Sequence, residues 1–339
     1  MLPKVSIIIL NFNGRSRLGE FLEKNIESVL ETDYPCFEVV FVDNGSEDHS
    51  VEYVKKKYYN ERLRIVCTGK NYGYCEGNNL GAKYACHDSE YLVFLNNDTL
   101  VDKMWLRKLV DVLEKDNNIG VAGSQILNMD GTIQLLGGNA DVFGRAMVVG
   151  GEEARALVEK CQPIKVLWVS GASLAIKKNL FLKNGGFDSS FFMYFDEIDL
   201  CARLVSKGLK VITVAASIVY HKGGTSNSAS VFYWVYRNRM LFMLKNFPRS
   251  LFLKCLTIRS IMDPLGAAIL GLAHNDSWRL NAIIRAYIFV LKNLGSLIQK
   301  RRMNPHKISA EYIAKTPYIL TPKNYKIYAL SKMLDLNRH

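Results

Sequence analysis

Three acidic side chains lie close together in the stretch MYFDEIDLCAR, where Asp196, Glu197 and Asp199 follow an aromatic-rich run at residues 191–195. A carboxylate held beside rings that exclude water can take a proton from a hydroxyl group, which is general-base chemistry. The same acids also have a structural interpretation, because acidic residues at the N-terminus of a helix cap it and favour its dipole. In that interpretation Asp196 is the N-cap and Asp199 is the third helical residue.

Two more carboxylates follow apolar runs of strand-like sequence. Asp43 ends the run VVFVD, and Asp98 follows the run VFLNN. Between them, residues 71–81 (NYGYCEGNNLG) contain three glycines, which let the backbone approach a ligand closely. Turn formation explains each acid taken singly, because Asp and Asn are common in turns. Two carboxylates at the ends of neighbouring strands of one sheet favour a binding site.

The first third of the chain must position these groups, and its pattern alternates strands and helices. Apolar runs predict strands at residues 5–10, 37–42, 63–67 and 91–96, with amphipathic helices between them. This rhythm predicts an α/β fold with an open, mostly parallel sheet, in which ligands bind beyond the carboxyl ends of the strands. The pattern becomes irregular after residue 125 and helical from about residue 231.

The net charge of +12 is confined to the end of the chain. Residues 1–239 hold 28 basic and 28 acidic residues, whereas residues 240–339 hold 16 basic and 4 acidic residues. This asymmetry favours a basic surface for anionic lipid or nucleic acid, attached to a neutral body. Apolar residues at helical spacing within 283–297 predict a helix that either lies in a membrane interface or packs on protein, including a second copy of the chain.

Several classes of protein are disfavoured by what the sequence lacks. The seven cysteines show no C-x-x-C spacing, so neither a zinc site nor a disulfide framework is predicted, and a reducing cytosol is the expected compartment. No uninterrupted apolar stretch reaches the ~18 residues of a membrane span. The turn NFNGRSRLG after the first strand lacks the glycine pattern of dinucleotide-binding dehydrogenases, and no phosphate-binding P-loop sequence occurs.

Seven blocks occur in a defined order: VSIIILNFNG, VVFVDNGSEDHS, NYGYCEGNNLGAKYA, YLVFLNNDT, VSGASLAIKKNLFLKNGGFDSSFFMYFDEIDLCARLVSKG, VYHKGGTS and YRNRMLF. With them, residues 4 to about 245 resemble the family 2 glycosyltransferases, and most of all their bacterial rhamnosyltransferase-like branch. The resemblance implies a GT-A fold at residues 1–230, with a nucleotide-binding half (1–125) and an acceptor half (126–230), before a basic helical region at 231–339. It also implies inverting transfer of a sugar from a nucleotide donor.

The resemblance assigns roles to individual residues. Glu197 would be the base that takes the proton of the acceptor, with Asp196 beside it, and Asp43 would accept hydrogen bonds from the pyrimidine ring of the donor. The residues implied for nucleotide binding are Asn11, Asp43, Asn71, Gly73, Asn78, Asn97 and Arg237, the last as a clamp on the diphosphate. The residues implied for the acceptor pocket are Gly171, Phe192, Tyr194 and Asp199.

A divalent metal ion, Mg²⁺ or Mn²⁺, is a further implication of the resemblance. Asp98 matches the final acid of the family's metal motif, but the motif is Asn96-Asn97-Asp98 here, so one carboxylate is missing. Oxygen atoms of the donor diphosphate and of water can complete the coordination of a hard ion. His221 matches a position that can add a nitrogen ligand, which is more natural for Mn²⁺.

The same resemblance implies the partners. They are dTDP-rhamnose or a UDP-sugar as donor and a glycan or polyprenyl-linked acceptor of cell-surface polysaccharide synthesis. The basic C-terminal region, and not the resemblance, adds an anionic membrane surface as a further partner. The protein is expected in the cytoplasm, peripherally on the inner face of the cell membrane, without nucleic acid; a homodimer through the C-terminal helices is the alternative to membrane binding. Two rival functions are a sugar-1-phosphate nucleotidyltransferase, whose Gly-rich loop is absent, and a basic nucleic-acid-binding protein.

Overall fold

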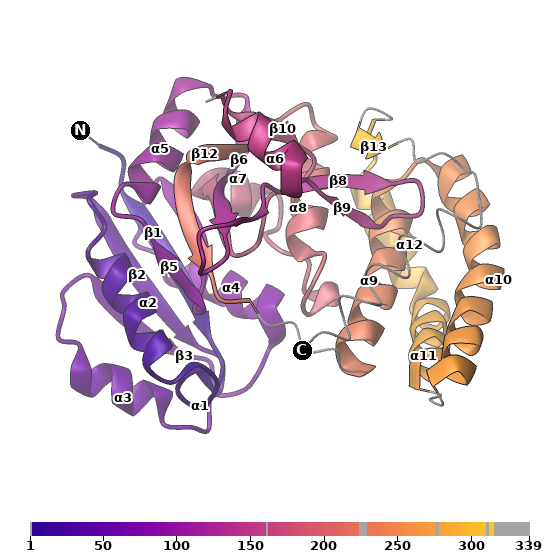
Figure 1. Cartoon of the computed structure of the whole chain (residues 1–339), viewed down its shortest axis with the longest axis horizontal. Coiled ribbons are helices and arrows are strands. Elements are labelled where there is room, and N and C mark those ends of the chain that lie inside the picture. Colours follow the sequence, from indigo (N-terminus) through magenta and orange to yellow (C-terminus); the bar gives the residue numbers. More distant parts are fainter. Residues whose placement is uncertain (1, 161, 224–228, 275–277, 310–311, 315–339) are drawn as a thin grey trace.

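The computed structural model describes residues 2–160, 162–223, 229–274, 278–309 and 312–314. At its centre is a mixed, mostly parallel β-sheet with flanking helices, and further helices lie to one side of it (Figure 1). The predicted fold class, an α/β sheet flanked by helices with additional C-terminal helices, is confirmed.

The first part of the chain contains the strands that the apolar runs predicted. Its elements are β1 (Val5–Asn11), α1 (Gly14–Leu18), α2 (Glu20–Leu30), β2 (Phe37–Asp43), α3 (Ser50–Lys57), β3 (Leu63–Cys67), α4 (Gly73–Tyr84), β4 (Tyr91–Asn96), β5 (Thr99–Val101), α5 (Trp105–Lys115) and β6 (Ile119–Leu127). Strands β1, β2 and β4 are mostly apolar and buried along nearly their whole length because both faces of the sheet are covered there. In β1, Ile8 packs into one buried cluster, and Ile7 and Ile9 pack into the other.

The second part completes the sheet. It contains β7 (Ile133–Leu135), β8 (Gly138–Asp141), β9 (Ala146–Val148), α6 (Gly151–Val158), β10 (Ile164–Val166), β11 (Ser173–Lys177), α7 (Lys178–Lys183), the 3₁₀ turn η1 (Ser189–Phe191), α8 (Asp196–Val205), β12 (Lys210–His221) and β13 (Ile313–Ala314). The strand order of the main sheet is β10-β12-β6-β11-β4-β1-β2-β3. Strand β11 runs antiparallel to both of its neighbours, β4 and β6.

Strand register brings the polar strand ends together. β1 pairs in parallel with β2 and with β4, and Asn11 lies opposite Asp43 while Leu10 lies opposite Asn96. The short strand β5 pairs antiparallel with the end of β12, which places His221 opposite Thr99. The three strand ends predicted to carry the site therefore share one edge of the sheet.

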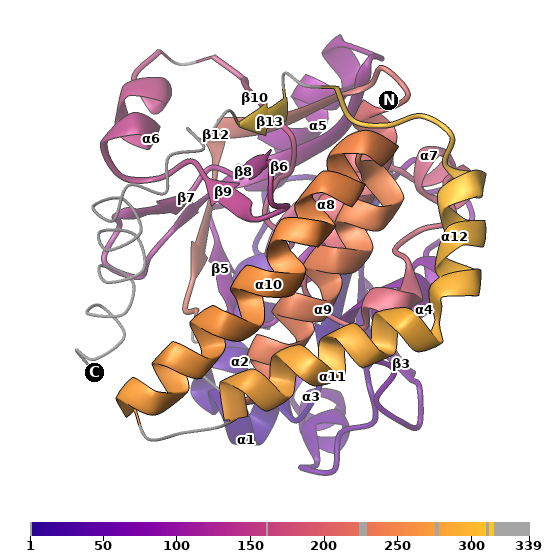
Figure 2. The same ribbon diagram turned by 90° about the vertical axis from the view of Figure 1, so that its right-hand side faces the viewer.

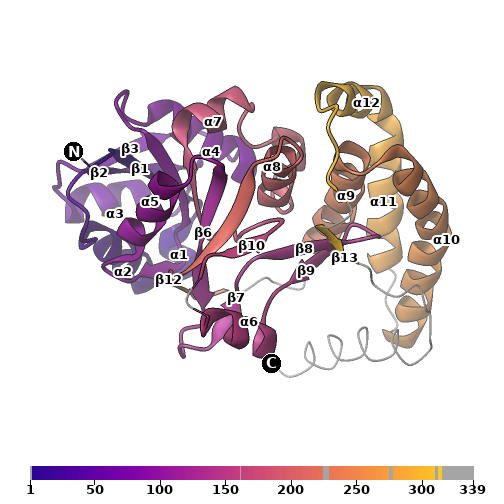
Figure 3. The ribbon, with the colours of Figure 1, turned by 90° about the horizontal axis from the view of Figure 1, so that it is seen from above.

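Four helices form the C-terminal part: α9 (Ala229–Asn246), α10 (Arg249–His274), α11 (Trp278–Lys292) and α12 (Leu294–Met303). Helix α9 lies between the sheet and the outer helices α10 and α11, and α12 lies beside α9 (Figures 2 and 3). Among the described residues, no single helix is long and apolar enough to cross a membrane. Helices α11 and α12 meet the length and composition criteria only together, and they are bent by 68°.

Candidate active site

Asn11 connects the ends of three strands. It is fully buried at the end of β1, where its Nδ2 donates to Asp43 Oδ1 (3.1 Å) and its Oδ1 accepts from Asn97 Nδ2 (2.9 Å). Asp43 Oδ2 accepts from the amide of Ser46 (3.0 Å), and a carboxylate has about four acceptor positions, so Asp43 retains capacity for a ligand. Three of the side chains predicted to bind the donor are thus brought together at the edge of the sheet.

Asn44 holds the loop before α4. Its Nδ2 donates to Asn71 Oδ1 and to the carbonyl of Gly73, both at 3.1 Å, and its Oδ1 accepts from the amide of Tyr72 at 3.1 Å. Gly73 has a φ of +76°, and a β-carbon there would lie 2.5 Å from the ring of Phe192. Asn71 and Gly73 therefore lie next to the end of β2, and only glycine fits where the loop meets the aromatic segment.

Asp98 and His221 face each other across β5 and β12, with His221 Nε2 at 3.3 Å from Asp98 Oδ1. The other ring nitrogen, Nδ1, lies 2.8 Å from Oε1 of Gln134, whose Nε2 donates to Asn128 Oδ1 (3.0 Å). With Gln134 oriented in this way, Nδ1 of the neutral imidazole carries the hydrogen and Nε2 presents its lone pair to Asp98. A lone pair facing a carboxylate is favourable only with a proton or cation between them.

This pair fits a divalent ion, although the residues that the structure describes supply only part of its ligand set. Among the described residues, no group of three or more His, Cys, Asp and Glu side chains could hold a metal. Asp98 and His221 would therefore supply one oxygen and one nitrogen ligand, and the remaining positions would be taken by phosphate oxygens and water.

Helix α8 begins at Asp196, and no acidic side chain caps it. Phe195 occupies the N-cap position with a φ of +66° and forms no side-chain capping bond. Asp196 is buried, and its Oδ2 has no hydrogen-bond partner among the described residues. The interpretation of Asp196 as the N-cap is wrong, because the helix starts one residue earlier than that interpretation requires.

Glu197 lies beside Tyr74 and Gly171. A β-carbon at Gly171 would be 3.8 Å from the carboxyl carbon of Glu197 and 3.3 Å from the hydroxyl oxygen of Tyr74. The Tyr74 hydroxyl donates to the carbonyl of Gly171 at 2.8 Å. Groups from α4, from the segment before β11 and from α8 therefore meet at the predicted base, and the absence of a side chain at Gly171 leaves room next to it.

Burial changes the acidity of this cluster. It raises the pKa of Asp196 well above its ordinary value, and the charge of Glu197 adds to that shift. Burial likewise raises the pKa of Glu197 to about 7. Burial also raises the pKa of Tyr74, and the negative charges of Asp196, Glu197 and Asp98 contribute. Tyr74 thus lies within electrostatic reach of both the predicted base and the predicted metal ligand, and the pKa of Glu197 suits proton transfer near neutral pH.

The aromatic segment before α8 has an unusual backbone. Phe192, Tyr194 and Phe195 have φ values of +64°, +65° and +66°, a region that bulky residues rarely adopt. The ring of Phe192 stacks on Trp234 of α9, with centroids 4.8 Å apart and planes at 18°. Phe192 and Tyr194 are half-buried. Their assignment to an acceptor pocket stays a prediction.

Two further predicted nucleotide-binding residues are buried and bonded to protein groups away from the strand ends. Arg237 is 3% exposed; its guanidinium lies over the ring of Trp234 (4.2 Å to the centroid) and donates to the carbonyl of Phe191 (2.8 Å). It cannot clamp a diphosphate from this position, so that prediction is corrected. Asn78 is 1% exposed, and its Nδ2 donates to the carbonyl of Tyr74 within α4 (3.0 Å).

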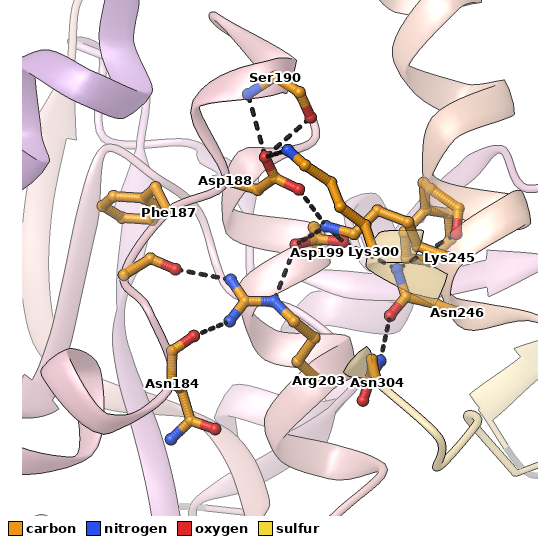
Figure 4. Close-up of polar contacts among 12 residues, drawn as sticks. Asn184, Phe187, Asp188, Ser190, Asp199, Arg203, Lys245, Asn246, Lys300 and Asn304 are labelled. Carbon is orange, nitrogen blue, oxygen red and sulfur yellow. Dashed lines mark hydrogen bonds and ion pairs between the residues drawn. The ribbon is translucent and has the colours of Figure 1, made fainter. Parts of the chain in front are cut away.

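Asp199, predicted to line the acceptor pocket, belongs to a buried ion network (Figure 4). Its carboxylate accepts from Arg203 Nε, Lys245 Nζ and Asn246 Nδ2, each at 2.9 Å. The side chain of Asp199 is fully buried. Burial alone would raise the pKa of Asp199, but the charges of Lys245 and Arg203 hold it below its ordinary value. The assignment to the pocket is therefore wrong, and the residue joins α8 to α9.

A second carboxylate extends this network to α12 (Figure 4). Asp188 accepts from Lys245 Nζ (2.6 Å) and from Lys300 Nζ (2.5 Å). Burial opposes the charge of Asp188, but the two ammonium groups hold its pKa below the ordinary value. The C-terminal helices thus contact the turn and helix that carry Glu197.

Three side chains that shape the site gave no sequence signal of their own: Tyr74, Gln134 and Asn238, whose Nδ2 donates to the carbonyl of Phe191 (2.9 Å). Their partners are distant in the chain, because Gly171 is 97 residues from Tyr74 and His221 is 87 residues from Gln134. Asn238 lies in the block YRNRMLF, so the block order alone could have drawn attention to it.

Comparisons with known proteins identify the family and the fold. The family model described as glycosyl transferase family 2 matches residues 6–198, more than half of the chain. The O-antigen biosynthesis protein RfbC of Myxococcus xanthus is 31% identical over 250 residues, which cover 69% of this chain and 19% of that protein. The chain therefore spans about a fifth of the length of this relative.

Two further proteins are similar. The N-acetylglucosaminyl-diphospho-decaprenol L-rhamnosyltransferase of Mycobacterium tuberculosis is 27% identical over 226 residues, covering 60% of this chain and 73% of that protein. The structure of GalNAc-T7 with UDP, GalNAc and Mn²⁺ matches with a TM-score of 0.63 at 15% identity, covering 99% of this chain and 58% of that chain. The latter likeness confirms the predicted GT-A-type fold. The chain belongs to glycosyl transferase family 2.

Proposed function

We propose that this protein transfers a sugar, with inversion, from a nucleotide donor to a hydroxyl group of a glycan or polyprenyl-linked acceptor in cell-surface polysaccharide synthesis. The observation that carries the proposal is the position of Glu197. Its carboxyl group is half-buried beside Gly171 and Tyr74, and burial raises its pKa to about 7. The charges of both Glu197 and Asp98 contribute to the raised pKa of Tyr74, which supports a position of the base near the donor edge.

In this proposal the residues of the chain have separate tasks. Glu197 takes the proton of the acceptor hydroxyl as its oxygen attacks the anomeric carbon, while the bond to the diphosphate breaks on the opposite side. A single displacement of this kind inverts the configuration. Asp43 accepts from the pyrimidine, and Asp98 and His221 would hold a divalent ion, whose chemistry is to neutralise charge on the leaving diphosphate.

The donor class rests on the relatives. The mycobacterial relative is by name an L-rhamnosyltransferase that acts on a decaprenol-linked sugar, and the structural neighbour GalNAc-T7 was solved with UDP. We therefore place dTDP-rhamnose first and UDP-sugars second. Incubation with a panel of nucleotide sugars, with release of the nucleoside diphosphate as the readout, tests the proposal. Synthesis of a nucleotide sugar from a sugar-1-phosphate would identify a nucleotidyltransferase instead.

Asp43→Ala is expected to weaken binding of the donor nucleotide by about 1.5–3 kcal/mol, the typical effect of losing a hydrogen bond to a charged group. Calorimetry with UDP and dTDP measures the change. Asp48→Ala is a suitable control, because Asp48 also binds backbone amides in this region but lies beyond the end of β2. Unchanged affinity of Asp43→Ala for both nucleotides would remove Asp43 from the site.

Asp98→Asn is expected to abolish the part of donor binding that depends on Mg²⁺ or Mn²⁺, because Asp98 is the carboxylate that faces His221. Titration of the nucleoside diphosphate with and without the metal ion gives this difference without any need for turnover. His221→Ala should reduce it for Mn²⁺ more than for Mg²⁺. Full activity of the wild type in excess chelator would contradict the metal assignment.

The composition of the outer helices supports the proposal that the protein acts while bound to an anionic membrane surface. Helices α10 to α12, which form the outer layer in Figure 2, contain nine basic residues and one acid, Asp263. That acid is ion-paired with Arg259 at 2.7 Å. These helices also carry ten large apolar side chains that are at least 38% exposed: Leu253, Ile261, Leu265, Ile269, Ile284, Ile288, Leu291, Leu294, Ile298 and Met303. Exposed apolar side chains among cations suit a membrane interface.

Vesicle co-sedimentation tests this location. The protein is expected to bind anionic vesicles more tightly than neutral ones, because each basic residue near such a surface contributes ~1 kcal/mol. The double variant Ile284→Glu/Ile288→Glu should lower that binding by on the order of 10-fold or more, since it puts charge on the apolar face. Leu182→Glu is the matched control, because Leu182 is 49% exposed on α7. Loss of a dimer in the double variant, with equal binding to both vesicles, would indicate a subunit contact.

A further inference from the structure

The segment that leads into α8 must be held in place by its surroundings. Phe192, Tyr194 and Phe195 all have positive φ, and Glu197 follows two residues after the last of them. Such backbone conformations of bulky residues persist only where neighbouring groups over-determine them. The groups that contact this segment therefore fix the position of the start of α8 and, with it, the orientation of Glu197.

Asn238 of α9 supplies most of these contacts. It is fully buried, and its Nδ2 lies within hydrogen-bond distance of three carbonyl oxygens of the segment. These belong to Phe191 (2.9 Å), Met193 (2.6 Å) and Tyr194 (2.8 Å). One amide group thus contacts carbonyls on both sides of position 192. The left-handed backbone at that position turns these carbonyls towards α9.

Arg237 orients that amide. Its Nε donates to Asn238 Oδ1 at 2.8 Å, which leaves Nδ2 of Asn238 to face the carbonyls. The guanidinium itself donates to the carbonyl of Phe191 (2.8 Å) and lies between the rings of Trp234 (4.2 Å) and Phe289 (4.5 Å). Burial lowers the pKa of Arg237 to about 10, so the group remains charged at neutral pH.

The opposite side of the segment contacts the donor-binding half. The amide of Cys75, in the first turn of α4, donates to the carbonyl of Phe192 (3.1 Å). Gly73 packs against the ring of the same residue. Residues 191–195 are therefore held between α4, which follows the predicted nucleotide loop, and α9, which belongs to the C-terminal helices.

We propose that Asn238, oriented by Arg237, is a positioning residue that holds residues 191–195 in their left-handed conformation and thereby aims Glu197 at the acceptor. The positioning of the segment follows from the contacts above, and its catalytic consequence rests on the proposed function. Asn238 touches neither substrate nor reacting atoms in this scheme.

Hydrogen exchange of the folded protein tests the structural half of the proposal. In Asn238→Ala, the amides of Phe192 and Met193, which donate to carbonyls of the preceding turn, should exchange roughly 10- to 100-fold faster, since the variant removes up to three hydrogen bonds that hold the segment. Asn238→Asp keeps the volume and the partner of Arg237 but places a carboxylate oxygen against the carbonyls, so it should have at least the same effect. Arg237→Lys retains the charge and loses the Nε donor, and a smaller acceleration is expected.

Asn293→Ala is the matched control. Its Nδ2 also donates to a backbone carbonyl, that of Phe289 at 2.8 Å, but it lies at the end of α11 and contacts no carbonyl of the segment. The amides of Phe192 and Met193 should exchange at the wild-type rate in this variant. Unchanged exchange in a folded Asn238→Asp, or the same acceleration in Asn293→Ala, would overturn the proposal whether or not the protein is a transferase.

Kinetics test the catalytic half. Asn238→Ala and Asn238→Asp should lower kcat by roughly 10- to 100-fold, with the Kd of the donor within about twofold of wild type, since Asp43 and Asp98 are untouched. The pH at which kcat rises should also move, because a looser segment admits water to Glu197. The titratable groups near Glu197 are Asp196 and Cys201 of α8 and Tyr74 and Cys75 of α4, because the charge of Glu197 contributes to the pKa shift of each.

The two readouts separate the possible failures. Faster exchange with wild-type kcat and pH profile would leave Asn238 a structural residue and overturn its role in positioning Glu197. Faster exchange in a protein that transfers no sugar from any donor would refute the proposed function and retain only the structural half. A lower kcat accompanied by equal loss of donor affinity would assign Asn238 to donor binding and also overturn the proposal.

Discussion

Replacing Glu197 with glutamine is expected to lower kcat by roughly 10²–10⁴-fold, the usual contribution of a general base, and to leave the fold intact. Glutamine keeps the length of the side chain and an acceptor oxygen, but it cannot take the proton of the acceptor. The substitution removes no helix cap, because Phe195 occupies the N-cap position of α8. Stability should therefore change by less than the ~0.5–2 kcal/mol that a lost cap costs.

The pH dependence of kcat identifies the group that is lost. With a pKa of about 7, Glu197 is mostly protonated in acid and cannot act as a base there, so wild-type kcat should rise with pH through neutrality. This rise of kcat with pH should be absent in Glu197→Gln. Burial raises the pKa of Tyr74 well above its ordinary value and that of Cys201 to about 12, so neither titrates in this range. Asp196→Asn is the control for the neighbouring carboxyl group.

Thermal melting and turnover must be measured on the same samples. The general-base role predicts an unchanged melting temperature with a large loss of kcat. A Glu197→Gln variant that unfolds at a lower temperature but turns over at the wild-type rate would return this acid to a structural role.

Lys245→Met is expected to lower the free energy of unfolding by about 3–5 kcal/mol, the typical cost of breaking a buried ion pair by removing one partner. The Lys245 side chain is 4% exposed and bridges Asp188 and Asp199. Methionine fills the space but leaves both carboxylates with less positive charge nearby. Arg203 still pairs with Asp199, so the effect is expected at the lower end of this range.

Urea unfolding at neutral pH measures this change, and two variants serve as controls. Lys300→Met removes a lysine that is 36% exposed, so it should cost only about 1 kcal/mol or less. The double variant Lys245→Met/Asp199→Asn should recover part of the loss, because it leaves fewer unpaired charges. A loss in Lys245→Met no larger than in Lys300→Met would show that the network does not join α8 to α9 energetically.

The network also sets a pH dependence of stability. The native pKa values of Asp188 and Asp199 lie below their ordinary values. Such groups stabilise the fold above the pKa of the unfolded chain, and that contribution is lost as the pH falls through the native pKa. The wild type should lose this stabilisation in acid, and Lys245→Met, which lacks much of it at neutral pH, should show a shallower decline.

The strands and the polar strand ends could be predicted because they depend on local pattern. A continuous apolar run such as VSIIIL is consistent with a strand covered on both faces, and its end places Asn11 at the ligand edge. The approach of His221 to Asp98 depends instead on the register of β5 with β12, which hydrophobic periodicity does not specify. The family resemblance supplied that pair, and the geometry agrees with it.

The corrected assignments of Arg237 and Asp199 share one physical cause, which is that burial of a charged residue is decided by distant segments. Arg237 looks like any helical arginine in sequence, but its environment includes Phe289 of α11. From its position near the start of α8, Asp199 could line a pocket or cap the helix. Its burial is favourable only because Lys245, from α9, donates to its carboxylate. The start of α8 was misplaced because a left-handed Phe195 has no sequence signature.

The separation along the chain between the carboxylates and their lysines has a consequence for synthesis. Lys245 lies 46 residues after Asp199, and Lys300 lies 112 residues after Asp188. At a translation rate of ~5–20 residues per second, several seconds pass between the synthesis of α8 and the synthesis of both lysines. Strands β1 to β4 can pair during that interval, but α8 of the nascent chain cannot bury Asp199 in its ion network without Lys245. We therefore expect the region around α8, with the proposed base Glu197, to be the last part of the nascent chain to form.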